Sequence, residues 1–497
     1  MSEKLLLLPI LIPALSALLI PAINFPDKKA RNIFIECSVL LNSIVIALLV
    51  IYPPANTLTL FRFSERASFS LRLDGLGMVF AVLIALLWPL TTLYAFEYMS
   101  HEHREPSFFG WFVLTYGVVA GIALSSNLLT LYLFYELMTF MTLPLVMHSQ
   151  KRESIRATIS YLLYSLTGAA MALGGFFFFQ VYGVSMEFTP GGVLDMARIT
   201  AEHSEGMLRT VTFLTLVGFG AKAGLVPLHA WLPTAHPVAP TPASAVLSGL
   251  ITKAGVIAMF RVVYYVVGDD FLRGTWVQTA LICMALLTIF TGSMMAYIEP
   301  HLKKRIAWSS VSQVSYVVFA MMLLTPDGIR GAVLQIAAHA MAKSCLFLSA
   351  GVVIYFTFQG ANYHYADQLR GVGKELPITM TCFALASVSL IGLPVTGGFT
   401  AKWYMAAGAL GLGNFGLFGI VILMVSALLT AGYLLPIVTD AFFPGDDYDY
   451  SSVVPFKLLP LKMIIPLLLL SAGTILTGIF GGSIIEFVNT RIIPVLL

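Results

Sequence analysis

Apolar runs of about 20 residues recur along the whole chain, and this feature limits the possible folds more than any other. A helix of that length spans the hydrocarbon core of a bilayer. Charged residues make up only 11% of the chain, against roughly 25% in a soluble domain. The sequence therefore predicts an all-α polytopic membrane protein that forms one integral membrane domain over residues 1–497. About fourteen runs fit a transmembrane helix: 4–25, 33–53, 75–98, 110–126, 127–148, 158–182, 209–230, 240–267, 277–297, 304–325, 329–358, 376–410, 413–441 and 460–489.

Two alternatives fail at the first of these segments, LLLLPILIPALSALLI. A strand of a membrane β-barrel would alternate polar and apolar residues over about ten positions, and this segment does not alternate. A cleaved signal peptide has a shorter apolar region and a small-residue cleavage site after a positively charged start. Here the apolar stretch is long, and only Lys4 precedes it. We expect the segment to remain as the first helix.

Lysine and arginine residues in the loops predict the orientation, because they are enriched on the cytoplasmic side of a membrane. With the N-terminus outside, fourteen of them fall on the cytoplasmic side: Lys28, Lys29, Arg31, Arg104, Lys151, Arg152, Arg156, Lys303, Lys304, Arg305, Arg370, Lys374, Lys457 and Lys462. Ten fall on the opposite side: Lys4, Arg62, Arg66, Arg72, Arg198, Arg209, Arg261, Arg273, Arg330 and Arg491. We therefore expect a multi-pass protein of the cell inner (cytoplasmic) membrane, with both termini outside. The net charge of +3 belongs to this topology signal and indicates no nucleic-acid partner.

The sequence shows no pattern that predicts a cofactor or a metal site. Cys37, Cys283, Cys345 and Cys382 lie in apolar segments without a CxxC pair, so we expect buried free thiols rather than metal or iron–sulfur ligands. The stretch GVGKEL at 371–376 lacks the spacing of a phosphate-binding loop. No histidine pair is obviously arranged for haem. We expect no cofactor and no redox chemistry in this chain.

Five charged residues lie inside the apolar runs: Glu136, Lys222, Lys253, Lys343 and Lys402. An ionisable side chain at membrane depth costs roughly 3 kcal/mol on insertion scales, so chains keep such groups mainly where protons or ions move. A structural ion pair, or a lysine that reaches to the membrane surface, is the alternative. Buried ion pairs are poor stabilisers, however. The set therefore predicts a component of an ion pump.

Two of the apolar segments are interrupted beside one of these lysines. In GFGAKAGLVPLHAWLPTAHPVAPTP, Pro227 cannot donate a helical hydrogen bond and Lys222 lies just before it. In SLIGLPVTGGFTAKWY, Pro394 stands among glycines and Lys402 lies just after it. Proline kinks are common in membrane helices, which is the simpler explanation. Paired interruptions in two halves of a chain instead indicate an inverted repeat and an ion path.

Three histidines add groups that titrate near neutral pH. His339 and Lys343 are four residues apart and therefore share one helix face. His229 and His236 flank the first interruption, where they could connect two lysines through water. For each, a core histidine bonded to a carbonyl is the alternative. The predicted proton path comprises Glu136, Lys222, Lys253, His339, Lys343, Lys402, His229 and His236.

These residues resemble the antiporter-like subunits shared by respiratory complex I, membrane-bound hydrogenases and Mrp-type sodium/proton antiporters. The likeness rests on GFGAKAGLVPLHAWLPTAHPVAPTPASAVLSGLITKAGVIAMFR, with YELM upstream and HAMAKSCLFLSAG and LPVTGGFTAKWY downstream. The resemblance implies fourteen helices, with helices 7 and 12 broken. It implies two inverted five-helix repeats, helices 4–8 in 110–267 and helices 9–13 in 277–441. Helices 1–3 would then occupy 1–109, and a loop and helix 14 would occupy 442–497.

The resemblance also implies roles for the buried charges. Glu136 would pair with Lys222 in a first half-channel, Lys253 would be the central relay, and Lys402 would lie in a second half-channel. Burial disfavours the charged form of a lysine, and a nearby carboxylate favours it. A movement of Glu136 would therefore switch Lys222 between holding and releasing a proton.

The leading hypothesis is a proton-translocating subunit, with sodium as an open alternative, in a complex I-like, hydrogenase-like or Mrp complex. The driving force would come from other membrane subunits, including a neighbouring antiporter-like subunit. The chain would then be the ion-pumping part of an oxidoreductase-type translocase without catalysing the redox step. The alternative is a self-sufficient secondary transporter of a small solute, because such transporters also use broken helices and inverted repeats. A scaffold without conduction is disfavoured, since apolar residues would stabilise it better than buried charges.

Overall fold

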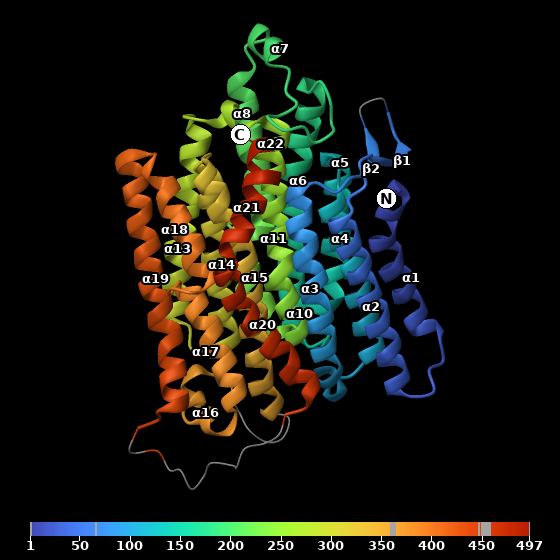
Figure 1. Cartoon of the computed structure of the whole chain (residues 1–497), viewed down its shortest axis with the longest axis vertical. Coiled ribbons are helices and arrows are strands. Elements are labelled where there is room, and N and C mark those ends of the chain that lie inside the picture. The colour runs from blue at the N-terminus through green and yellow to red at the C-terminus, as the bar shows by residue number, and fades with distance from the viewer. Residues whose placement is uncertain (1, 65–66, 358–363, 446–447, 449–458, 497) are drawn as a thin grey trace.

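The computed structural model describes residues 2–64, 67–357, 364–445, 448 and 459–496. They form a bundle whose long helices run between two opposite ends of the molecule (Figure 1). The helices are α1 (Leu8–Ala22), α2 (Lys28–Ile51), α3 (Gly75–Tyr98), α4 (Glu105–Leu124), α5 (Leu128–Val146), α6 (Arg152–Tyr182), α7 (Met196–Ala201), α8 (Glu205–Ala223), α9 (Trp231–Val238), α10 (Thr241–Val246), α11 (Thr252–Arg261), α12 (Asp269–Leu272), α13 (Trp276–Ile298), α14 (Leu302–Met322), α15 (Pro326–Thr357), α16 (Val372–Glu375), α17 (Pro377–Ile391), α18 (Gly397–Leu410), α19 (Gly413–Phe442), α20 (Leu461–Ile479), α21 (Gly481–Arg491) and α22 (Ile493–Leu496).

Eleven helical spans in the described residues are long and apolar enough to cross a membrane. The predicted multi-pass helical membrane protein is therefore confirmed. Three expected crossings are not among the eleven: the broken pairs α8–α9 and α17–α18, and α14. Helices α9, α17 and α18 are short, whereas polar and charged residues lower the hydropathy of α8 and α14. The full count of fourteen stays a prediction.

Two of the spans lie at the centre of the bundle. One comprises α10, α11 and two π-helical turns, over Thr241–Val267, and the other is α15. In the most apolar window of each, every residue is buried by the rest of the chain, whereas only a third is buried in the corresponding window of α19. Helix α15 packs against α14, α17, α18 and α20. Because Lys253 lies on the first span and His339 and Lys343 lie on the second, these groups are screened from lipid.

Both predicted interruptions are present. Helix α8 ends at Ala223 and α9 begins at Trp231, while α17 ends at Ile391 and α18 begins at Gly397. A glycine in the left-handed conformation follows the first helix of each pair, with a φ of +82° at Gly224 and +89° at Gly392. Glycine adopts this conformation without the steric cost that a Cβ atom brings, which allows a helix to end there.

Some features differ from the sequence predictions. The loop at 54–72 contains an antiparallel hairpin of β1 (Leu58–Arg62) and β2 (Ser68–Leu71), which the all-α prediction missed. The last predicted helix is divided into α20 and α21. The segment at 186–208 contains the short helix α7. The acidic stretch expected as a loop within 442–459 lies largely outside the described residues.

Three more details concern individual positions. Cys345 and Cys382 are buried as expected, but Cys37 and Cys283 are exposed on the bundle surface, which corrects the expectation for these two. Arg261 was counted as an outer loop cation, but it is helical and buried, and it forms a bidentate ion pair with Asp74. Both chain termini lie towards the same end of the bundle as the hairpin and α7 (Figure 1). Which side of the membrane this end faces stays a prediction.

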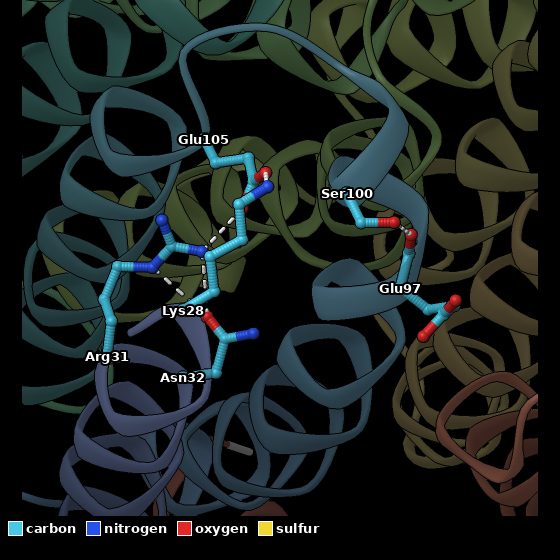
Figure 2. Close-up of polar contacts among 6 residues, drawn as sticks. All are labelled: Lys28, Arg31, Asn32, Glu97, Ser100 and Glu105. Atoms are coloured by element: carbon cyan, nitrogen blue, oxygen red, sulfur yellow. Dashed lines mark hydrogen bonds and ion pairs between the residues drawn. The ribbon is translucent and has the colours of Figure 1, made fainter. Parts of the chain in front are cut away.

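An ion cluster joins the first turns of α2 and α4 at the opposite end. Lys28 Nζ and Arg31 Nη2 each lie 2.5 Å from a different carboxylate oxygen of Glu105. Figure 2 shows both cations turned towards this carboxylate. Arg31 and Glu105 are buried, and the guanidinium also lies 5.6 Å from the ring centre of Phe109. The cluster therefore fixes α2 against α4 near the membrane surface.

Candidate functional site

Lys222 is fully buried in the last turn of α8, directly before the first helix break. Its ammonium donates hydrogen bonds to Thr139 Oγ1 and, at 3.3 Å, to the hydroxyl of Tyr161. It also lies 5.1 Å from the ring centres of Tyr135 and Tyr161, a cation–π geometry. Lys222 is thus held by neutral oxygen atoms and aromatic faces.

Close approach of two helices makes this arrangement possible. Gly218 of α8 faces Gly168 of α6, where a Cβ on either glycine would lie 2.4 Å from the other's carbonyl oxygen. Trp231, the first residue of α9, donates from its indole nitrogen to the carbonyl of Ala221 at 2.8 Å. This bond holds the two parts of the broken segment together beside Lys222.

Glu136 lies on α5, three residues before Thr139, and is half-buried. Its Oε1 atom is buried and has no hydrogen-bond partner among the described residues. No ion pair within 4.0 Å joins Glu136 to Lys222 in this part of the chain, although their charges act on each other through space. The pairing of Glu136 with Lys222 implied by the resemblance stays a prediction, and Thr139 is the nearer partner of the Lys222 ammonium in this structure.

Lys253 and His339 are in direct contact at the centre of the bundle. The Lys253 ammonium lies 2.5 Å from His339 Nδ1 and donates to the carbonyl of Ser248 at 2.5 Å. A protonated lysine has no acceptor site, so Nδ1 must accept, which places the proton of a neutral imidazole on Nε2. Nε2 is buried and lacks a partner among the described residues. The ring is thus hydrogen-bonded through Nδ1, and its Nε2 is left without a partner among the described residues.

Lys343 lies one turn after His339 on the same face of α15, as its spacing predicted. Its ammonium donates to Ser309 Oγ and, at 2.9 Å, to the carbonyl of Ile306. Both acceptors belong to α14. The next residue of α14, Ser310, shares a hydrogen bond of 2.7 Å with Ser248, whose carbonyl binds Lys253. Helix α14 therefore binds Lys343 directly and is connected to Lys253 only through Ser248.

Lys402 lies on α18 and reaches back over the second break. Its ammonium donates to the last two carbonyls of α17, those of Leu390 at 2.7 Å and Ile391 at 2.8 Å. A cation at this position offsets the partial negative charge at a helix C-terminus. The ammonium is also 5.1 Å from the ring centre of Tyr316 on α14.

The two histidines beside the first break lie in different surroundings. His229 is half-buried, with its ring 5.6 Å from that of Trp308, and its Nδ1 has no partner among the described residues. His236 is completely buried, stacks on Phe347 at 4.7 Å, and has no described partner for either ring nitrogen. The predicted connection from Lys222 to Lys253 through these rings is not made by any hydrogen bond in the described residues.

Two buried glutamines extend the polar row beyond His339, and the sequence analysis missed them. Gln335, one turn before His339 on α15, donates to the side-chain oxygen of Gln313 on α14 at 2.9 Å. Gln313 lies three residues before Tyr316, whose ring faces Lys402. The row therefore runs from Lys253 through His339 and the glutamine pair towards Lys402. Polar residues without charge in a serine-rich helix gave no signal strong enough to single them out.

A polar cavity of about 800 Å³ opens at the end of the bundle that holds the Glu105 cluster. Its lining includes five histidines: His101, His103, His148, His301 and His364. It also includes Pro237 and Val238, which follow His236 directly. Lys303 lines it as well, with its ammonium donating to the carbonyl of Ala239 at 2.6 Å. The cavity thus reaches the C-terminal end of α9, the second part of the first broken segment, from one end of the bundle.

Partial burial shifts the pKa values of several titratable groups in the cavity lining. Burial lowers the pKa of His148, and it also lowers the pKa of His301, where Lys303 and His364 add to the effect. Burial raises the pKa of the Glu102 carboxyl, against the opposing charges of Lys151 and Lys303. Each shift favours the neutral form of the group. These three groups are therefore shifted towards their neutral forms, in a lining that also holds the cations Arg104 and Lys151.

Comparison with known proteins identifies the family of this chain. Residues 125–430 match the family model described as NADH:quinone oxidoreductase/Mrp antiporter, TM, which is more than half of the chain. Residues 63–109 match a model described as NADH-Ubiquinone oxidoreductase (complex I), chain 5 N-terminus. The chain belongs to the NADH:quinone oxidoreductase/Mrp antiporter family.

Relatives of this family match almost the whole chain. NADH-quinone oxidoreductase subunit N of Desulforudis audaxviator is 31% identical over 437 residues, which covers 85% of this chain and 84% of that protein. The putative antiporter subunit mnhD2 of Staphylococcus aureus is 26% identical over 498 residues, covering 98% of this chain and 95% of that protein. A chain in the structure of the Mrp complex from Dietzia sp. superposes with a TM-score of 0.82 at 21% identity, over 98% of this chain and 96% of that one. The chain is therefore an antiporter-like membrane subunit with the fold of this family.

Proposed function

We propose that this antiporter-like subunit translocates protons, with sodium as an open alternative, within a multisubunit complex of the complex I, hydrogenase or Mrp type. The contact between Lys253 and His339 carries the proposal. A proton donor and an imidazole are bonded to each other where the bundle is fully closed to lipid. Ionisable groups at this depth are costly in a membrane, and chains keep them mainly where protons or ions move.

The proposed path has three parts. Lys222 receives a proton near the first break, under the influence of the charge on Glu136. Lys253 and His339 relay it through the centre, with Lys343 beside them. The glutamine pair on α14 and α15, followed by Lys402 at the second break, completes the path. His229 and His236 would join the first two parts through water.

The proposed topology completes the crossings. The broken pairs α8–α9 and α17–α18, together with α14, would supply the three crossings beyond the eleven apolar spans. The repeats would then be 110–267 and 277–441, and both termini would face the outside of the inner membrane. The histidine-lined cavity would open to the cytoplasm and supply protons to the path.

Replacement of Lys222 tests the proposal. We expect Lys222→Ala to abolish proton translocation by the complex in reconstituted vesicles while the complex still assembles, since its only role would be in the path. Lys29→Ala, at an exposed lysine of α2, is the matched control and should leave transport unchanged. Normal translocation by an assembled Lys222→Ala complex would remove this lysine from the mechanism.

The broken helices also fit the second candidate, a self-sufficient transporter of a small solute. The two candidates differ in their dependence on partners. We expect the purified chain in liposomes to insert but to show little coupled transport, because it shows no driving reaction of its own. Vigorous electroneutral or solute-driven exchange by the chain alone would favour the independent transporter.

A further inference from the structure

Glu36 is an intramembrane carboxylate outside the proposed path. It lies in the third turn of α2, among residues of one of the apolar spans. Glu36 is half-buried and enters no hydrogen bond or ion pair among the described residues; its Oε2 atom is covered by the chain itself. An ionisable group at this depth almost always has a partner or a function. A partner from outside the chain would therefore meet the exposed part of this carboxyl group.

The cations nearest to Glu36 in sequence are engaged elsewhere. Lys28 and Arg31 both bind Glu105 at the end of the helix, as Figure 2 shows. Lys29 is exposed and lies two turns before Glu36, about 10 Å along the helix axis. The described ion pairs include none between Lys29 and Glu36. None of the cations in the first turns of α2 therefore forms an ion pair with Glu36 in the described residues.

The rest of α2 is divided between a packed face and an exposed face. The packed face is fixed by hydroxyl contacts, of Ser38 with Ser16 on α1 and of Ser43 with Tyr116 on α4. The exposed face carries large apolar side chains, and Glu36 lies at its border. Those on the turns around Glu36 are Ile33, Leu40, Leu41 and Ile44. Helices α1 and α2 form one edge of the bundle, opposite α19 (Figure 1).

Lipid chains could cover the apolar residues but could not satisfy the carboxylate, because they have no hydrogen-bond donor. We propose that the α2 face formed by Ile33, Glu36, Leu40, Leu41 and Ile44 docks a transmembrane helix of another subunit, which presents a cationic or hydrogen-bond-donating side chain to Glu36. The inference rests on the proposed function only in assigning the chain to a complex. It places one subunit contact on the edge formed by α1 and α2, away from the Lys222–Lys402 path.

Photo-crosslinking in the assembled complex tests this contact. A benzophenone amino acid replaces Leu40, one turn from Glu36, and the membranes are irradiated before the adducts are identified by mass spectrometry. We expect an adduct with a transmembrane segment of one other subunit that carries a donor side chain within a turn of the crosslink. The same labelled chain, purified alone into lipid nanodiscs, should crosslink only to lipid.

Variants at Glu36 then separate the carboxylate from the apolar contact. Glu36→Leu should lower the protein adduct about tenfold, the effect of losing one charge-assisted hydrogen bond, while Glu36→Gln should keep part of it. Replacing the donor on the partner with leucine should lower the adduct equally, with no further loss in the double variant. An adduct with lipid alone in the complex, or an unchanged yield with Glu36→Leu, would overturn the docking surface. Because Glu36 is outside the path, transport that persists without a protein adduct would refute this inference and leave the proposed function intact.

Discussion

Substitution of His339 separates a proton relay from a packing contact at the centre of the bundle. The imidazole is bonded to Lys253 through Nδ1, and its buried Nε2 has no partner among the described residues. Asparagine can place an oxygen near the Nδ1 position, but its amide cannot exchange a proton near neutral pH. His339→Asn therefore preserves the hydrogen bond and removes the relay. His339→Ala removes both.

The magnitudes of the two roles differ enough to be measured. Loss of a hydrogen bond to a buried ammonium costs about 1–3 kcal/mol, which asparagine should largely restore. A positioned group that transfers protons contributes about 10²- to 10⁴-fold to a rate. If His339 is a relay, we expect both variants to lower proton translocation by at least about 100-fold. If it is only a contact, His339→Asn should remain close to the wild type.

The assay is proton uptake by the purified complex in vesicles, followed with a pH-sensitive dye and normalised to assembled complex. His203→Asn provides the control, because this histidine is exposed in a loop. Thermal unfolding of each variant shows whether the bundle remains folded. Translocation above half of the wild-type rate in His339→Asn would refute the relay.

Substitutions at Glu136 and at Arg261 test two other charged groups. Glu136→Gln should impair transport while Glu136→Asp retains part of it, because the proposal requires a charge near Lys222; equal vesicle activities would show that the carboxyl serves only as a hydrogen-bond partner. Arg261→Met should destabilise the bundle by about 3–5 kcal/mol, since it leaves Asp74 without its bidentate cation. Arg198→Met breaks an exposed, solvent-screened ion pair and is the matched control, for which little change in thermal unfolding is expected. A similar loss of stability in both arginine variants would contradict the importance of burial.

The sequence was sufficient to predict the helices and the positions of the buried lysines, because a charge inside an apolar run stands out locally. The helix breaks were also predictable, since proline and glycine act on the backbone of their own segment. The partners of the lysines were not. Thr139 and Tyr161 bind Lys222 from α5 and α6, and such contacts depend on how helices distant in sequence are rotated against each other. Spacing along one helix contains no information on that rotation.

The features that the sequence analysis missed have a common physical origin. Glu36 is one carboxylate in a span whose average hydropathy is high, so the average conceals it. Gln313 and Gln335 are uncharged, and only their contact across α14 and α15 distinguishes them from ordinary core amides. The hairpin at 54–72 has strands of four and five residues, too short to give a clear alternating pattern. Each of these features can be identified only from the arrangement of the segments in the folded chain.

The four lysines of the proposed path share one property that bears on the mechanism. Within the described residues, Lys222, Lys253, Lys343 and Lys402 donate only to neutral acceptors: hydroxyls, backbone carbonyls and an imidazole nitrogen. A neutral acceptor favours the charged form of a lysine less strongly than a carboxylate does. A carboxylate that moved to 4 Å would add about 4 kcal/mol at an effective dielectric constant of 20, or about a thousandfold in proton affinity. Lysines already bound to carboxylates would have little of this response left. The observed ligands therefore leave each lysine sensitive to a charge that approaches from Glu136, from its neighbour in the path, or from another subunit.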